Sequence, residues 1–123
     1  MIKQRILDHG NGDAIGDCFN TCVANIIGMP YEDVPHFVEI GKEHWWEFTI
    51  NWAEANGYRI GAYKPEGLEL IPGALVIGTG KSPRGNFNHS VILDSNLELY
   101  FDPHPDDTGI ETLLDVIVIE PKD

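Results

Sequence analysis

The chain has 123 residues, 42% hydrophobic and 23% charged, which is enough for a single domain with one core over residues 1–123. Eight Lys and Arg residues against 20 Asp and Glu residues give a net charge of −12, which argues against nucleic-acid or anionic-membrane partners because both attract basic surfaces. No segment approaches the ~20 apolar residues of a membrane span, and residues 1–12 lack the apolar region of a signal peptide, so we expect a cytoplasmic protein.

The first predicted element is a helix over residues 17–27. Its apolar residues recur at spacings of three and four and share one helix face: Phe19, Cys22, Val23, Ile26 and Ile27. Asp17 is a favourable N-cap, and Gly28 followed by Pro30 is a favourable stop.

A turn-rich stretch over residues 31–37 leads to a second predicted helix over residues 42–56, which Gly57 ends. Its apolar row consists of Trp45, Phe48, Trp52 and Ala55. Three tryptophans at or near helical spacing, Trp45, Trp46 and Trp52, are more typical of a core than of a ligand site.

The second half is predicted to form strands over residues 58–63, 74–77, 90–93, 97–101 and 116–119. The third and fourth runs are separated by three polar residues, which is typical of a hairpin. Helices followed by antiparallel strands indicate an α+β fold. The segment 78–88 is predicted to be a long loop with three glycines and a proline, and such loops often carry function.

Two cysteines, Cys18 and Cys22, lie one helical turn apart. We expect free thiols, because a reducing compartment disfavours disulfides and this spacing on a helix gives poor disulfide geometry. Cys18 lies at the predicted helix start, where the helix dipole favours a thiolate, although a small packing residue fits that position equally well. Cys22 belongs to the apolar face and is predicted to be inert packing.

A nucleophilic cysteine needs a base, and the base needs a group that orients it. His89 is the best placed histidine, because it opens an apolar strand after the Gly-rich segment. A two-residue turn at residues 95–96 pairs residue 89 with residue 102, so that Asp102 faces His89 across two strands. Asp94 points to the opposite face, roughly 16 Å away. The pattern therefore predicts a Cys–His–Asp constellation that a one-residue register slip would break.

Two other interpretations compete with this constellation. Taken without Cys18, His89 and Asp102 are more typical of a polar pair at a sheet edge that has no chemical role; the order Cys, His, Asp favours the site. A metal site is the other alternative, because Asp102, His104 and Asp106 alternate after the strand, with His36 or His89 as a further ligand. No pair has the spacing of a recognised zinc or calcium motif, so no metal and no other cofactor is expected.

The stretches GDCFNTC, NHSVIL and Asp102-Pro103 resemble the papain-like cysteine peptidase fold, in the order found in its bacteriocin-processing branch. There a cysteine starts the first long helix, a histidine begins a strand, and Asp-Pro ends the next strand; the matching residues here are Cys18, His89 and Asp102. Over most of the chain, GDCFNTCVANIIGMPYEDVPHF, SPRGNFNHSV and FDPHP also resemble short uncharacterised proteins of phages and bacteria. The resemblance implies a small papain-like fold, with the helix that carries Cys18 packed on an antiparallel β-sheet.

This sequence departs from the papain-like pattern before the cysteine. Papain-like enzymes usually place a glutamine about six to ten residues upstream, as a side-chain donor to the oxyanion. Here the nearest glutamine is Gln4, fourteen residues before Cys18. A Gly-rich insertion within residues 8–12 would allow Gln4 to reach the site by looping out, and Asn11 is the other candidate.

Two residues before His89 are candidates for binding the substrate. Arg84 has the charge and geometry to pair with a carboxylate, although a solvated loop charge is the simpler interpretation. Asn88, directly before His89, is the second candidate.

Two functions are compatible with these residues. The first is a cysteine-dependent hydrolase or acyltransferase that acts on a peptide, isopeptide or side-chain amide of a protein or peptide substrate, with Cys18 as nucleophile, His89 as base and Asp102 as orienting group. The second is a non-catalytic binding or inhibitor protein on the same fold, which acts on a host protein or a small signal molecule, in the host cytoplasm if the chain is phage-encoded. The reactivity of the Cys18 thiol distinguishes the two.

Overall fold

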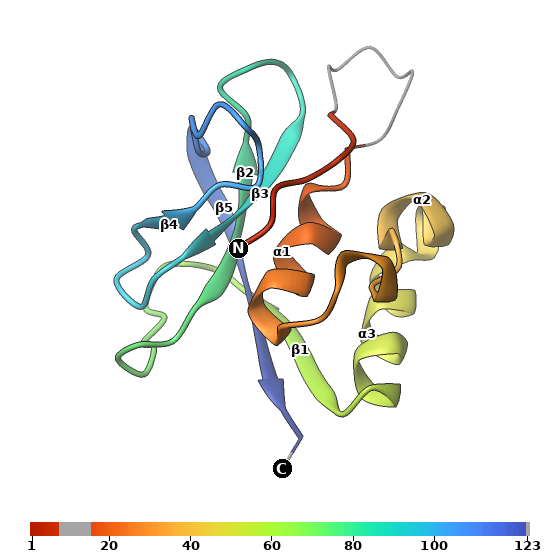
Figure 1. Cartoon of the computed structure of the whole chain (residues 1–123). Helices are drawn as coiled ribbons and strands as arrows, with labels where there is room; N and C mark the ends of the chain where they lie inside the picture. Colours follow the sequence, from red (N-terminus) through yellow and green to blue (C-terminus); the bar gives the residue numbers. More distant parts are fainter. Residues whose placement is uncertain (8–15, 123) are drawn as a thin grey trace.

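The structure, a computed structural model, describes residues 1–7 and 16–122. The helices are α1 (Cys18–Ile27), α2 (Phe37–Gly41) and α3 (Trp45–Ala55), with 3-10 turns at Tyr31–Asp33 and Lys42–His44. The strands are β1 (Tyr58–Tyr63), β2 (Val76–Lys81), β3 (Asn88–Leu93), β4 (Leu99–Phe101) and β5 (Thr112–Pro121). They form one antiparallel sheet in the order β1-β5-β2-β3-β4, and the helices lie together on one side of it (Figure 1). The predicted α+β class is confirmed.

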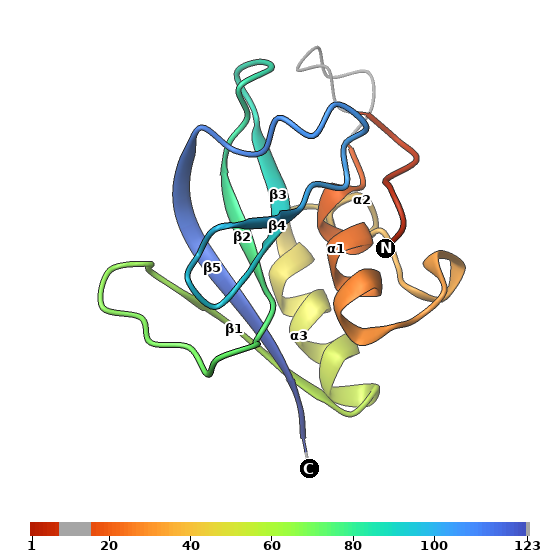
Figure 2. The same cartoon turned by 60° about the vertical axis from the view of Figure 1, so that its left-hand side comes forward.

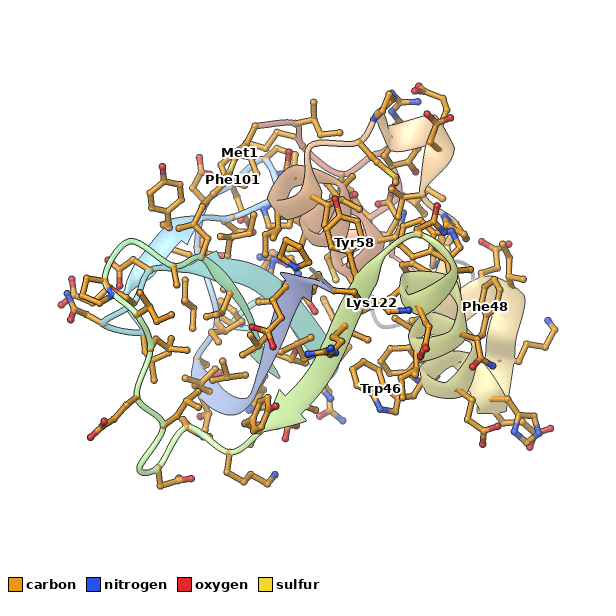
Figure 3. All side chains as sticks on the ribbon, turned by 90° about the horizontal axis from the view of Figure 1, so that it is seen from below. Met1, Trp46, Phe48, Tyr58, Phe101 and Lys122 are labelled. Carbon is orange, nitrogen blue, oxygen red and sulfur yellow. The ribbon has the colours of Figure 1, made fainter. Side chains whose placement is uncertain are left out.

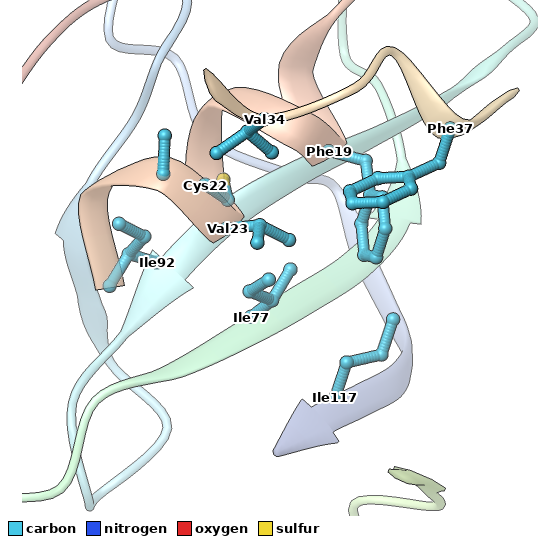
Figure 4. Packing of buried hydrophobic residues seen from close by; sticks show 9 residues of the cluster. Phe19, Cys22, Val23, Val34, Phe37, Ile77, Ile92 and Ile117 are labelled. Carbon is cyan, nitrogen blue, oxygen red and sulfur yellow. The ribbon is translucent and has the colours of Figure 1, made fainter. Parts of the chain in front are cut away.

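Helix α1 packs on the middle of the sheet and fills the main core. Phe19, Cys22 and Val23 from the helix meet a row of isoleucines from β3, β2 and β5 (Figure 4), namely Ile92, Ile77 and Ile117. Phe37 and Val34, from the segment after α1, close the same core. Each such side chain contributes about 1.5–3 kcal/mol when it is fully buried. This packing fixes the position of the α1 N-terminus relative to β3.

The ends of α1 agree with the prediction in position but not in every contact. Gly28 adopts a left-handed conformation with φ 75°, and its N–H donates to the carbonyl of Ala24 at 2.9 Å. Asp17 precedes the helix but its side chain does not cap it. Its buried carboxylate instead accepts the backbone N–H groups of Arg5 at 3.1 Å and Ile6 at 2.9 Å, and the hydroxyl of Tyr31. Asp17 therefore fastens the N-terminal segment to the start of α1.

The second predicted helix, over residues 42–56, forms a 3-10 turn followed by α3, and the short helix α2 before it was not predicted. Lys42 has a positive φ of 52°, which separates α2 from α3 through a 3-10 turn. Trp45, Phe48 and Trp52 pack against the core as predicted, with Thr49 and Ala53 fully buried between them. The prediction for Ala55 is wrong, since it is exposed. Position 55 lies at the margin of the inward face that positions 45, 49, 52 and 53 share.

Part of the predicted loop over residues 78–88 is strand. β2 continues to Lys81, which leaves only residues 82–87 as a turn. The glycines allow β2 to extend this far because atoms of the adjacent strands come very close to its backbone. A Cβ on Gly78 would lie 2.5 Å from the Leu93 side chain, and one on Gly80 would lie 1.9 Å from the carbonyl oxygen of Thr112.

The predicted hairpin between β3 and β4 exists, but its turn is longer than predicted. The Asp94 carboxylate accepts the N–H groups of Asn96 at 2.9 Å and Glu98 at 3.0 Å, and Leu97 has a φ of 62°. β4 therefore begins at Leu99. Residue 93 pairs with residue 99, one beyond the predicted partner, and a bulge between Ile92 and Leu93 adds a second residue, so that residue 92 pairs with residue 101 and not with residue 99. A shift of two residues keeps each side chain on the same face of the sheet, so the facing pattern survives the error.

Long-range pairing places β5, the last strand, between β1 and β2 near the centre of the sheet. The opposite face of the sheet is covered by residues of the connecting segments, which form a second cluster with Val76, Val91, Leu93 and Val116. Figure 2 shows the helical layer and the sheet as two separate layers. Within the described residues, no helix has the length and apolar character needed to cross a membrane.

Candidate active site

The site forms where the N-terminus of α1 meets the edge of the sheet. His89 is the second residue of β3, and Asp102 directly follows β4. The His89 Nε2 lies 2.7 Å from the Asp102 Oδ1, and both side chains are buried, with 2% and 0% exposed. The predicted contact between these residues is confirmed, although it is made across the shifted register and not by directly paired residues.

The Asp102 carboxylate is held on both oxygens. The backbone N–H of His104 donates to Oδ1 at 2.9 Å, and the N–H of Gly109 donates to Oδ2 at 2.7 Å. Burial alone would raise the pKa of Asp102, but the hydrogen bonds from His89, His104 and Gly109 bring it below its usual value. The carboxylate is therefore ionised and cannot rotate freely, as an orienting group requires.

The imidazole of His89 lies between Asp102 and Cys18. Burial lowers the pKa of His89, but the hydrogen bonds and charges of Asp102 and Cys18 outweigh it and raise the pKa to about 9. At neutral pH the imidazolium is thus the favoured form. Since Nε2 is bonded to Asp102, Nδ1 is the nitrogen left to exchange a proton with the Cys18 thiol.

The two cysteines have different surroundings. Cys18 is the first residue of α1, half-buried, and lines a cleft together with His89. Cys22, one turn later, is completely buried in the core with Phe19 and Val23, as predicted. The pKa of Cys22 is raised well above its usual value, mainly by burial and further by the charges of Cys18 and Asp102. Cys22 is therefore a neutral packing residue.

Gln4 reaches this cleft through a hydrogen-bonded N-terminal segment. Its backbone N–H donates to the carbonyl of Pro103 at 2.9 Å, and its side-chain Nε2 donates to the carbonyl of Ile6 at 2.8 Å. The side chain is buried and lines the cleft with Cys18. One Nε2 hydrogen remains for another acceptor. Asn11, the other oxyanion candidate, lies outside the described residues, so its role stays a prediction.

The two predicted substrate-binding residues line the same cleft. The Arg84 guanidinium donates to the Asp106 carboxylate at 3.2 Å and to the Thr108 hydroxyl at 2.8 Å. It therefore joins two loops and is not the solvated charge that the simpler interpretation assumed. Asn88 is exposed at the start of β3.

The alternative metal set is not assembled. Among residues 1–7 and 16–122, no group of three His, Cys, Asp or Glu side chains is arranged to hold a metal ion. The Asp102 carboxylate is occupied by His89 and two backbone N–H groups. The His104 Nδ1 accepts the backbone N–H of Asp106 at 3.1 Å, and His36 accepts the N–H of Glu39 as the N-cap of α2.

The cleft beside Cys18 has a volume of about 480 Å³. Its apolar walls come from α1, α2, α3, β5 and the turn before β3: Phe19, Val38, Trp45, Trp46, Ile117 and Phe87. The prediction that Trp45 and Trp46 are simply core residues is therefore incomplete. Trp46 extends from α3 toward β1 (Figure 3). Helical spacing could not reveal this, because the opposite wall of the cleft comes from distant strands.

A row of polar residues across the sheet forms the floor of the cleft. Ser90, Thr79 and Asp115 are direct partners on β3, β2 and β5, and the Thr79 and Ser90 hydroxyls lie 3.3 Å apart. This row lies two residues from the isoleucine row under α1 and faces the same side. The face thus changes from apolar to polar where α1 begins, which leaves an open cleft. The sequence analysis missed Thr79, Ser90 and Asp115. The only sequence pattern that indicates them is that each lies two residues from a buried isoleucine on its strand and so faces the same side of the sheet.

Comparisons with known proteins add no assignment to this geometry. No protein-family model, no curated protein and no solved structure matches the chain.

Proposed function

We propose that this chain is a papain-like cysteine hydrolase or acyltransferase that acts on an amide bond of a protein or peptide. The observation that carries the proposal is the buried His89–Asp102 pair beside the half-buried Cys18 in an open cleft. A structural pair at a sheet edge would not need a thiol on the second nitrogen of the imidazole. The order helix with Cys18, strand with His89, then Asp102-Pro103 supports the papain-like assignment.

The chemistry follows from the protonation states of the pair. A Cys18 thiolate attacks the substrate carbonyl carbon and forms a C–S bond, and the carbonyl π electrons move to oxygen. When the tetrahedral intermediate collapses, the C–N bond breaks and the His89 imidazolium gives its proton to the leaving amine. The product is a thioester on Cys18. Water, or another acceptor nucleophile, then attacks the thioester, His89 takes its proton, and the thiolate leaves.

The oxyanion formed in these steps needs hydrogen-bond donors. The first N–H groups of α1 have no partner within the helix and lie beside Cys18. The Gln4 amide lines the same cleft and keeps one free N–H. In this proposal Gln4 supplies the side-chain donor, although fourteen residues separate it from Cys18. The Asp17 carboxylate, which binds the N–H groups of Arg5 and Ile6, holds that segment in place.

The proposal is tested by the alkylation rate of each cysteine with iodoacetamide, followed by mass spectrometry of the two labelled positions. We expect Cys18 in the folded protein to react at pH 6 at least tenfold faster than the same thiol in urea-unfolded protein, because an ordinary thiol of pKa about 8.5 is then almost fully protonated. Cys22 should not react in the folded protein, since it is fully buried.

His89→Ala is the matched variant, because it retains Cys18 and removes its proton acceptor. It should return the Cys18 rate to that of the unfolded chain. Equal rates for Cys18 in the folded and unfolded wild-type protein at pH 6 would contradict the proposal. Turnover of an activated ester then distinguishes a complete catalytic cycle from a thiolate that only reacts once.

A further inference from the structure

The cleft carries a carboxylate two strands away from β3. Asp115 on β5 lines the cleft and is the direct partner of Thr79, which in turn is the partner of Ser90. Strands are spaced about 4.8 Å apart, so Asp115 lies about 10 Å across the sheet from Ser90, which follows His89. A group bound beside the nucleophile must therefore be long to reach Asp115.

One wall of the cleft is apolar and aromatic. Trp45 and Trp46 at the start of α3, with their ring centroids 5.6 Å apart, line the cleft together with Ile117. Such a surface binds a methylene chain, and a tryptophan ring also attracts a cation at the end of that chain. An apolar passage that ends at a carboxylate is complementary to a long side chain with a positive end.

A lysine of the chain itself already occupies the Asp115 carboxylate. The Lys64 ammonium lies 3.1 Å from the Asp115 Oδ1, which shows that a primary ammonium fits this position. Lys64 approaches from the rim, with 73% of its side chain exposed. Exposed ion pairs of this kind contribute only about 0–1 kcal/mol, so a substrate cation can displace Lys64 at low cost.

The remaining charges of the cleft favour the same substrate. Arg84, which also lines the cleft, is already paired with Asp106, so it does not neutralise Asp115. The net charge of −12 attracts cationic peptides to the protein at long range. A negatively charged substrate would be repelled both by Asp115 and by the protein as a whole.

We propose that the cleft selects substrates in which a long, positively charged side chain, such as that of arginine or lysine, lies next to the amide that Cys18 attacks, with Asp115 as the specificity-determining residue. This inference rests on the proposed function. The stem of the side chain packs on Trp45 and Trp46, and its charged end binds Asp115 in place of Lys64.

The test measures alkylation of Cys18 by dipeptidyl chloromethyl ketones, in which the thiolate sulfur bonds the methylene carbon and chloride leaves. Either dipeptide position carries arginine, its neutral isostere citrulline, norleucine or glutamate. At one of the two dipeptide positions, we expect the arginine compound to alkylate Cys18 at least tenfold faster than the citrulline compound, and the glutamate compound to react slowest. The preference is read as the ratio of the arginine and citrulline rates within each variant, so that a general change in thiol reactivity cancels.

Three variants locate the preference. Asp115→Asn should reduce the ratio to within twofold of one, whereas Lys64→Met should preserve or increase it, because the competing ammonium is gone. Glu111→Gln is the matched control: Glu111 is a β5-side carboxylate paired with Lys81 at 3.8 Å outside the cleft, so its loss should leave the ratio unchanged.

The outcomes separate the two proposals. A ratio near one in the wild-type protein, or a ratio that persists in Asp115→Asn, overturns the inference while rapid iodoacetamide labelling still supports the proposed function. Slow iodoacetamide labelling of wild-type Cys18 at pH 6 overturns the proposed function itself.

Discussion

Cys18 and Cys22 are one turn apart on the same helix, yet they have opposite surroundings. Cys22 points between α1 and the sheet, is fully buried, and has a raised pKa because burial penalises its thiolate. Cys18 lies in the first turn, at an open cleft, beside an imidazolium whose pKa of about 9 reflects its carboxylate partner. The difference shows that two thiols of one helix can have opposite surroundings, because each faces different groups of the sheet and the cleft.

The largest expected effect comes from Asp102→Asn, which should reduce the reactivity of Cys18 toward that of the buried Cys22. The amide cannot stabilise the imidazolium of His89, so turnover of an activated ester should fall on the order of 10²–10⁴-fold. Because the carboxylate also accepts the N–H groups of His104 and Gly109, the variant should lose about 1–3 kcal/mol of stability as well. Urea unfolding measures the second effect.

Asp94→Asn is the control for that variant. Asp94 accepts backbone N–H groups in the β3–β4 turn and has no contact with His89 among its hydrogen bonds. Turnover should be unchanged. A loss comparable to that of Asp102→Asn would mean that the hairpin, not the His89 partner, controls the reactivity of Cys18.

The pH dependence of stability tests the charge state of His89. Its pKa is about 9 in the folded protein and 6.5 in the unfolded chain. The protonated imidazole therefore stabilises the fold fully below pH 6.5, and this contribution is lost as the pH rises through about 9. The free energy of unfolding should fall by roughly 3 kcal/mol over that window.

His89→Gln removes the titrating group and should flatten this part of the pH profile, which is measured by urea unfolding at several pH values. A wild-type stability that is constant between pH 6.5 and 9 would contradict the imidazolium assignment. In that case the contrast between Cys18 and Cys22 would depend on exposure alone.

Replacing each cysteine with alanine compares the contributions of the two thiols to stability and to labelling. Cys22→Ala leaves a small cavity between α1 and the sheet and should cost about 1–3 kcal/mol, while iodoacetamide labelling of Cys18 continues. Cys18→Ala should change stability by less than about 1 kcal/mol and abolish labelling in the folded protein. Thermal unfolding measures both; equal destabilisation by the two substitutions would show that the thiols share one environment.

The smallest expected effect concerns the support of Asp102. The Lys3 ammonium donates to the carbonyls of Asp102 at 2.9 Å and His104 at 3.1 Å and pairs with Asp107. Lys3→Met keeps the apolar stem but loses these bonds, so the Cys18 alkylation rate should fall a few-fold and stability by about 1 kcal/mol. A rate identical to wild type would show that Asp102 is held by its own backbone contacts alone.

Local sequence patterns predicted the elements and the chemistry of single positions. The spacing of apolar residues gave α1 and the burial of Cys22, and Gly28 marked the helix end, because each depends on residues within one or two turns. The contact of His89 with Asp102 was also predicted, although the turn is one residue longer than predicted and a bulge between Ile92 and Leu93 shifts the register by a second residue. It survived because the register error is even, and an even shift keeps side chains on the same face.

Tertiary structure alone decided what surrounds the candidate nucleophile. β5 pairs with β1 and β2, and this pairing places Asp115 beside Thr79 in a cleft that Trp46 also lines, although these three residues lie far apart in the sequence. The N-terminal segment reaches the cleft with Gln4 because the Asp17 carboxylate binds its backbone. No local pattern encodes such contacts, since strand order and long-range hydrogen bonds depend on the packing of the whole sheet. The sequence by itself therefore determined the candidate residues, and the fold determined which groups surround them.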